Sequence, residues 1–423
     1  MSFLSPGAAR YAAALFLVAV AWVLPPPLQA APAISLNEAV RRAVDRAPLI
    51  AARQSQVVSA QQDSRRAGAL PDPMLSVGLQ NLPVTGSPAF DLSADEMTMK
   101  TVGLRQDIPA RAKRQAERTL ATRRVDAAQA ATDSQRQDTR RAVAMAWIDL
   151  WAAQRQGDAL ARVREQAALA AGIAHARVRS GADSASEALA ADAEVLDLDN
   201  RIAGNQTDVR MAQAALQRWL GDADAATTPD APDFTQLPYP PAHLQAAIDR
   251  LPALRPSAAQ VETAAAQIDL ARAQRHPDWS IEATYGQRSG GRSDMLSVQV
   301  GIGLPLFPGE RQDRDVAARQ ADYQAALDVH EDARRQQSAQ LQADLARWEG
   351  LQRQVALHEQ RMLPLARDRA AAALAAYRAG GELRPWLEAT RAELDVHLGH
   401  AEHLAELGRA WAALAFLLPE HTP

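Results

Sequence analysis

The segment LSVQVGIGLPL, residues 296–306, alternates apolar side chains with small or polar ones. The apolar side is formed by Leu296, Val298, Val300, Ile302, Leu304 and Leu306, and the other side carries Ser297, Gln299, Gly301 and Gly303. A period of two is typical of a β-strand whose two faces meet different surroundings. A strand of about ten residues with one apolar and one polar or glycine face has the pattern of a membrane β-strand.

Three other segments repeat this alternation, at residues 75–80, 279–286 and, less regularly, 97–108, where Lys100 and Gln106 interrupt the pattern. A half-buried soluble sheet is the ordinary alternative, but no globular core is evident that the apolar faces could cover. Four strands alone cannot close, and the open edges would be costly in lipid. Several copies must therefore share one barrel, and three copies would supply about twelve strands, enough for an aqueous lumen.

The two halves of the chain repeat one plan, since short matches recur in order at offsets between 198 and 208 residues. Pro71-Asp72 recurs as Pro277-Asp278, Val102-Gly103-Leu104 as Val300-Gly301-Ile302, and Arg179-Ser180-Gly181 as Arg378-Ala379-Gly380. Ordered self-similarity of this kind indicates a tandem duplication. We expect a first repeat at 34–221, a Pro- and Asp-rich linker at 222–241, a second repeat at 242–419 and a short tail at 420–423.

Each repeat is expected to contain one very long helix, at about 109–180 and 310–379, with Pro364 kinking the second. About 70 residues at 1.5 Å per residue span about 105 Å, too long for one globular domain. Shorter helices at about 35–69 and 184–220 together match that length. Two of them stacked end to end beside the long helix would give a rod of uniform thickness.

The first 33 residues have the order of a secretory signal: Arg10, an apolar run from Tyr11 to Leu24, three prolines and a stretch of small residues. The apolar run is shorter than the roughly 20 residues that a membrane-spanning helix needs. We therefore expect export with cleavage, and no later apolar run of spanning length follows.

Composition excludes several functions. The 46 basic and 50 acidic residues give a net charge of −4, which does not favour a nucleic-acid partner. The absence of cysteine excludes disulfides, thiolate chemistry and lipidation of an N-terminal Cys. The sequence contains no H-E-x-x-H, G-x-S-x-G or P-loop motif, so we expect no enzyme activity and no cofactor.

Taken together, these features resemble the TolC-like outer-membrane factor (outer membrane efflux protein) family over the whole mature chain. The stretches 71–79, 81–83 and 97–104, followed by Gln106, Pro109, Lys113 and Arg114, resemble its heavy-metal cation efflux branch. The resemblance implies an α+β membrane protein of the Gram-negative outer membrane. It also implies a homotrimer with a twelve-stranded barrel, four strands per chain, continued by a long periplasmic α-helical barrel, with a periplasmic adaptor and an inner-membrane pump as partners.

The resemblance also suggests where function is located. Its periplasmic tips would be the turns after the long helices, at Arg179 and Gly181 and at Arg378 and Gly380, where an adaptor would dock. Glycine suits such turns because it accepts positive φ after a helix end. Entrance candidates are the acidic residues Glu388, Glu382, Asp183 and Glu187, although Pro385-Trp386 departs from the family pattern. An ordinary solvated helix charge remains an equal alternative for each of the four.

Three histidines of the last helix, His397, His400 and His403, have a spacing at which divalent metals can bind. At 100° per residue they spread over about 120° of the helix surface, so a solvated polar face is favoured over a metal site. Two other functions stay open: a drug-efflux or type I secretion duct, and a soluble periplasmic coiled-coil adaptor. The adaptor would be soluble without detergent.

Overall fold

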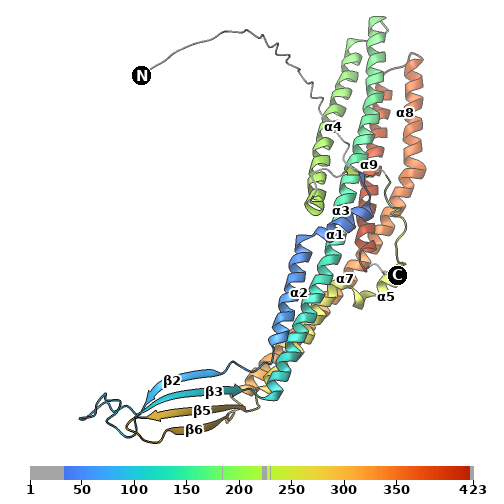
Figure 1. The fold of residues 1–423 in the computed structure, drawn as a ribbon. Helices are drawn as coiled ribbons and strands as arrows, with labels where there is room; N and C mark the ends of the chain where they lie inside the picture. The colour runs from blue at the N-terminus through green and yellow to red at the C-terminus, as the bar shows by residue number, and fades with distance from the viewer. Residues whose placement is uncertain (1–32, 183, 222–225, 229, 420–423) are drawn as a thin grey trace, which may run out of the picture.

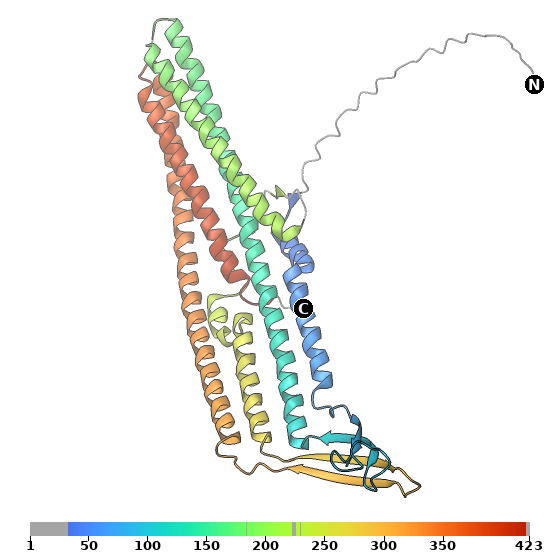
Figure 2. The same cartoon turned by 90° about the vertical axis from the view of Figure 1, so that its left-hand side faces the viewer.

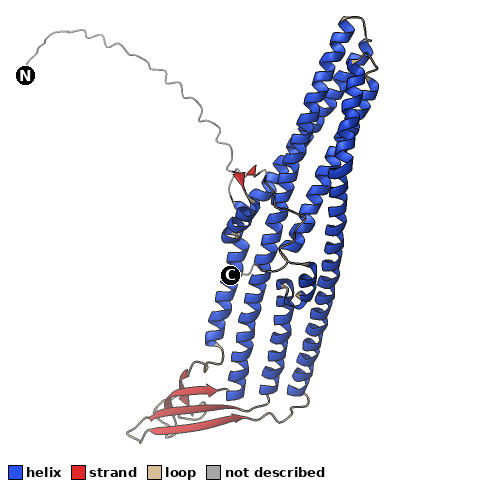
Figure 3. Cartoon of the chain, turned by 90° about the vertical axis from the view of Figure 1, so that its right-hand side faces the viewer, coloured by secondary structure: helices blue, strands red, loops and turns tan. Residues whose placement is uncertain are grey.

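The computed structural model describes residues 33–182, 184–221, 226–228 and 230–419. The expected signal segment therefore lies outside the described residues, apart from Ala33. A long rod of helices carries a four-stranded sheet at one end, and the sheet is turned sharply away from the rod axis (Figures 1 and 3).

The sheet contains β2 (Met74–Gln80), β3 (Met99–Ile108), β5 (Asp278–Arg288) and β6 (Met295–Gly303), in the order β2-β3-β5-β6 and antiparallel throughout. All four predicted strands are confirmed, with shifted ends. The strand expected at 296–306 ends at Gly303, before Pro305, which has no backbone N–H to continue a ladder. The segment expected from Met97 begins as a strand at Met99.

The register places apolar residues on one face of the sheet. Val77 pairs with Val102, Val102 with Tyr285, and Tyr285 with Leu296. Opposite residues of an antiparallel pair share a face, so these four form one apolar row. The neighbouring row on the other face is small and polar: Ser76, Gly103, Thr284 and Ser297. Val77 is 77% exposed and Leu296 is 73% exposed, so no part of the chain that the structure describes covers the apolar face.

The first long helix, α3 (Arg111–Arg179), runs without interruption for 69 residues. Its counterpart consists of α7 (Gln312–Leu357), a π-helical turn (His358–Met362) and α8 (Leu363–Arg378). The predicted irregularity at Pro364 is confirmed, because the π turn directly precedes the proline. Proline lacks an N–H and its ring clashes with the carbonyl four residues earlier, so the backbone there widens its turn.

The shorter helices form the second layer of the rod. The first segment, expected as one helix over 35–69, is broken into α1 (Leu36–Arg46) and α2 (Pro48–Arg66), because Pro48 forces Ala47 into an extended conformation. In the second half, α5 (Pro241–Ala246) and two short 3-10 turns precede α6 (Arg255–Ala273). Figure 2 shows α2 and α4 (Ala185–Leu220) following one another along α3, and α6 and α9 (Arg384–Ala415) along α7 and α8.

A hydrophobic core at the middle of the rod was not expected from the composition. Three buried tryptophans hold loop backbone there through their indole N–H groups. Trp147 donates to the carbonyl of Ile34 at 2.8 Å, Trp348 to that of Phe234 at 2.9 Å, and Trp411 to that of Gln236 at 2.7 Å. Phe234 lies in the expected linker, yet it is only 4% exposed. This part of the 222–241 segment is therefore packed structure that joins the two repeats.

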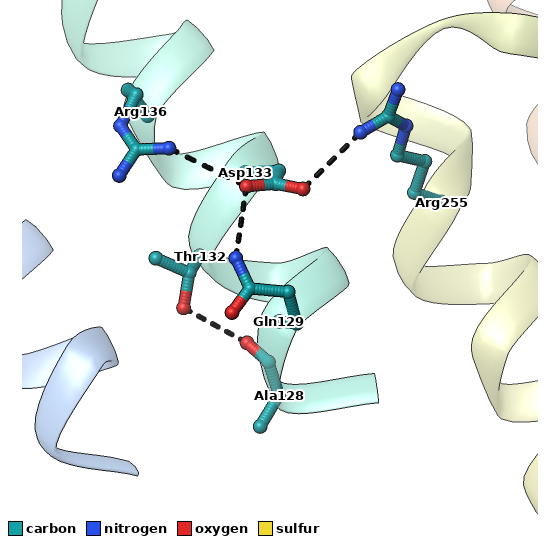
Figure 4. A network of polar contacts seen from close by, with 6 residues as sticks. All are labelled: Ala128, Gln129, Thr132, Asp133, Arg136 and Arg255. Atoms are coloured by element: carbon teal, nitrogen blue, oxygen red, sulfur yellow. Dashed lines mark hydrogen bonds and ion pairs between the residues drawn. The ribbon is translucent and has the colours of Figure 1, made fainter. Parts of the chain in front are cut away.

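Asp133 of α3 connects the two repeats below this core. Figure 4 shows its carboxylate between Arg136 of the same helix, at 3.4 Å, and Arg255 at the start of α6, at 3.2 Å. Gln129 donates to the same carboxylate at 3.2 Å. The carboxylate is only 28% exposed, so a shared network of this kind fixes the register of α6 against α3 better than an isolated surface pair would.

Candidate functional site

The two helical hairpins end together at the end of the rod that is far from the sheet (Figure 2). After α3 the chain reverses at Gly181, with φ of 75°, and after α8 it reverses at Gly380, with φ of 101°. The amide of Ala182 donates to the carbonyl of Arg177, and that of Gly381 to Ala376, which satisfies the open carbonyls of both helix ends. The turns predicted beside Arg179 and Arg378 are thus present, and a docking role for them stays a prediction.

Three of the four acidic candidates lie at the same end of the rod. Glu187 is in the first turn of α4, where the helix dipole favours a negative charge. Glu382 lies in the exposed connection between α8 and α9. Glu388 pairs with Arg384 one turn earlier at 3.0 Å, and both side chains are more than half exposed, so this pair contributes little stability. Asp183 lies outside the described residues.

Arg177 of α3 holds the second hairpin near the tip. Its Nη1 donates to the backbone carbonyl of Tyr377 on α8 at 3.0 Å, and its guanidinium lies 4.8 Å from the centre of the Tyr377 ring. Tyr377 is fully buried in a small apolar cluster with Leu383 and Trp386. A cation over an aromatic face adds to the hydrogen bond. The two hairpins are therefore connected by a defined polar contact.

A second connection lies further from the tip, between α4 and α9. Arg391 donates to the carboxylate of Glu194, which is only 3% exposed. This hydrogen bond raises the pKa of Arg391 above its ordinary value. Neither of these contacts was foreseen from the sequence. Both depend on how the two hairpins, which are about 200 residues apart in the sequence, are positioned relative to each other along the rod axis. No local sequence pattern encodes that position.

The three histidines of α9 do not form the solvated face that was expected. His397 and His400 have side chains that are only 21% and 18% exposed. His400 and His403 pack against His358 of the π turn, whereas His397 lies 3.8 Å from Glu393. Within the described ranges, no three His, Cys, Asp or Glu side chains are placed to hold one metal ion. Sequence spacing along one helix could not reveal His358 as the neighbour.

The sheet joins the rod at Asp278, the first residue of β5. Its carboxylate accepts hydrogen bonds from the amide of Ala110 at 2.8 Å and from Lys113 Nζ at 2.7 Å. The side chain of Lys113 is only 17% exposed, so this contact orients the sheet on the beginning of α3. Among the helices of the described part of the chain, none is long and apolar enough to cross a membrane.

The chain combines an extended helical rod with a sheet that has one bare apolar face. The two outer strands of this sheet have no further partner among the described residues. This is the architecture of an outer-membrane channel subunit. The chain belongs to the outer membrane efflux protein family, whose model matches residues 39–222 and 243–419. The two matched segments are separated by the stretch that joins the repeats.

Solved structures share this fold at low sequence identity. The outer membrane protein VceC from Vibrio cholerae has 19% identity and a TM-score of 0.73, with 90% of this chain and 95% of that chain covered. The transmembrane channel protein CusC has 16% identity and a TM-score of 0.77, with 91% and 92% covered. The open state of the MtrE outer membrane channel of Neisseria gonorrhoeae has 16% identity and a TM-score of 0.73, with 90% and 88% covered. Among curated protein sequences, none matches the chain.

The family and the efflux role predicted from the sequence are therefore confirmed. Members of this family are channels of the Gram-negative outer membrane rather than enzymes, and they work as homotrimers with an adaptor and an inner-membrane pump. Membership argues against the alternative of a soluble coiled-coil adaptor. The heavy-metal branch and the transported substrate stay predictions.

Proposed function

We propose that three copies of this chain form a passive exit duct across the outer membrane. Each copy contributes its four strands to one twelve-stranded barrel, and the helical rods continue it as a periplasmic tunnel. The observation that carries the proposal is the sheet itself: its apolar face is bare, and β2 and β6 have unpaired outer edges among the described residues. Pairing β6 of one copy with β2 of the next would satisfy both edges and present the apolar face to lipid.

The far end of the rod is the proposed periplasmic entrance. The exposed turns at Arg179 and Gly181 and at Arg378 and Gly380 would contact the adaptor. Glu187, Glu382 and Glu388, repeated in three copies, would place negative charge near the opening and favour cations, as rings of carboxylates do in cation pores. The chain supplies no energy, so transport would depend on the pump at the inner membrane.

Heavy-metal cations are the cargo that we propose. The support is the resemblance of residues 71–79 and 97–104 to the heavy-metal branch, together with the acidic tip. A drug-efflux or secretion duct would share the same architecture, so the test must compare substrates directly.

A deletion strain provides that test when it is complemented with the wild-type chain or with an empty vector. We expect the chain to fractionate with the outer membrane and to restore resistance to cobalt, zinc, cadmium, copper or silver. Restored resistance to drugs without any effect on metal resistance would refute the proposal of a heavy-metal cargo, but not the proposal of an exit duct. A chain found only in the soluble periplasmic fraction would refute the duct.

A further inference from the structure

Three imidazoles meet where the second long helix is interrupted. His358 begins the π turn and is 9% exposed, so it is largely buried. Its ring is stacked on that of His400, with centroids 6.1 Å apart and planes inclined by 22°. The ring of His403 meets it edge-on at 5.0 Å and 80°. The contact therefore joins the π turn to α9, on the side of the α8–α9 hairpin that is away from its turn at Gly380.

The three rings lack hydrogen-bond partners on one side. The Nδ1 atoms of His358, His400 and His403 are each buried without a partner in the structure. A neutral imidazole offers one donor and one acceptor, and an imidazolium offers two donors. A buried polar atom without a partner is costly, and a buried unpaired charge costs more. The packing is therefore compatible with neutral rings and unfavourable for charged ones.

The charged neighbours do not offset this cost. Among the described residues, the carboxylate of Glu359 forms an ion pair with this cluster, but its Oε1 lies 3.8 Å from His400 Nε2, beyond hydrogen-bond distance. Burial lowers the pKa of His400, and His358 and His403 lower it further against the opposing effect of Glu359. Burial also lowers the pKa of His397, with Arg162 of α3 and Arg367 of α8 acting in the same direction. The carboxylate of Glu393, 3.8 Å from His397, is itself largely buried.

We propose that the contact of His358 with His400 and His403 is a proton-sensitive joint between the π turn and α9. When the rings are neutral they pack and hold α9 against the turn. When two or more acquire a proton, repulsion between the rings and the demand for water separate α9 from the turn. The interrupted helix is the place where the backbone can yield, because a π turn is already a departure from regular α-helical hydrogen bonding.

The direction of the pH dependence follows from proton linkage. In the packed contact, burial lowers the pKa of His400, so this ring binds a proton less tightly than an exposed histidine, whose ordinary pKa is 6.5. The contribution of His400 to the contact is therefore complete above that value and falls as the pH drops below it, until the lowered pKa of His400 is passed. The expected window lies on the acid side of 6.5.

Hydrogen–deuterium exchange of the full mature protein in detergent tests this proposal. Exchange is compared at pH 7.5 and 5.5 after correction for the intrinsic rate. We expect peptides that cover residues 355–366 and 397–406 to exchange several-fold faster at the lower pH. In His358→Gln/His400→Gln this acceleration should disappear. His175→Gln, which changes a half-exposed histidine of α3 next to Asp192, should retain it.

A second measurement avoids histidine variants. The chain contains no cysteine, so Gln360→Cys and Glu406→Cys place two spin labels on exposed positions of the turn and of α9. With labelled chains diluted in unlabelled ones, the intrachain distance should lengthen or broaden at pH 5.5. Unchanged distances and exchange at both pH values would overturn the proposal. Changes in distance or exchange that EDTA abolishes would also overturn the proposal, because a bound metal ion would then be their cause.

Discussion

Arg177 of α3 donates a hydrogen bond to the backbone carbonyl of Tyr377 on α8 at 3.0 Å, and its guanidinium also lies 4.8 Å from the centre of the Tyr377 ring. This one side chain connects the hairpin of the first repeat with that of the second, close to the tip. The pair of Glu194 and Arg391 makes a similar connection further along the rod. In an entrance formed by these hairpins, such contacts would limit how far the hairpins can separate.

Removing the first contact should loosen the entrance. In Arg177→Ala the hydrogen bond and the cation–π contact are both lost, at an expected cost of about 1–3 kcal/mol. The single-channel conductance of the purified protein in planar bilayers should rise several-fold. Arg353→Ala, which removes an exposed arginine of α7, is the control and should leave conductance unchanged. If both variants have the conductance of the wild type, the contact between Arg177 and Tyr377 does not control the opening of the entrance.

The two faces of the sheet should respond differently to the same charge. Val298→Arg places a cation on the apolar face, which would cost about 2–4 kcal/mol at mid-height in a bilayer. We expect this variant to be lost from the outer-membrane fraction or to insert poorly. Ser297→Arg places the same charge on the opposite face, next to Thr284, and should still insert. Similar insertion of both variants would show that the apolar face does not meet lipid.

The stability of the core at the middle of the rod should depend on the hydrogen bond that the indole N–H of Trp147 donates. Trp147→Phe preserves most of the buried ring but removes one of the two donors to the carbonyl of Ile34, which then keeps only the amide of Thr228 at 3.2 Å. Ile34 is only 5% exposed. Losing this hydrogen bond should cost about 0.5–1.5 kcal/mol, so the midpoint of chemical denaturation should fall. Trp219→Phe changes a half-buried ring that lies 4.7 Å from the Arg218 guanidinium and should have a smaller effect.

The acidic tip should favour cations. In Glu187→Gln/Glu382→Gln/Glu388→Gln, the ratio of cation to anion permeability should fall towards one. The reversal potential under a potassium chloride gradient measures this ratio. Glu331→Gln, on the exposed side of α7 with Arg334 and Arg335, should keep the wild-type value. A triple variant with unchanged selectivity would mean that these carboxylates are ordinary solvated charges.

Glu393 should make the protein less stable as the pH rises above 4.5. Burial raises the pKa of its carboxyl, with Arg367 opposing the shift, so the folded state holds this proton more tightly than the unfolded state. Its contribution is present below the unfolded value of 4.5 and is lost as the pH rises through the raised pKa. The difference in denaturation midpoint between wild type and Glu393→Gln should therefore decrease as the pH rises from 4 to 7. The difference between wild type and Glu402→Gln should stay constant over the same range.

Local patterns were sufficient to predict the strands and the long helices. Period-two alternation located all four strands, because each has apolar side chains on one face and small or polar ones on the other. The absence of proline located α3, and Pro364 marked the interruption before α8. The ends were less accurate: Pro48 divided an expected helix, and Pro305 shortened an expected strand. In each case a single proline overrode the surrounding pattern.

The contacts between distant helices could not be predicted in the same way. His358 and His400 are about forty residues apart, and Arg177 and Tyr377 about two hundred. Whether two such residues meet depends on how the helices are staggered along the rod. The Trp147, Trp348 and Trp411 side chains and the Asp133 network set that stagger, and both depend on packing that is completed only when the two repeats assemble.

The central claim is that each copy brings too few strands to form a pore and therefore shares one barrel with two others. Native mass spectrometry of the purified mature protein in detergent tests it most directly. A species with the mass of three chains, which dissociates into single chains on heating, is the predicted result. A monomer that stays soluble in buffer without detergent would contradict the account.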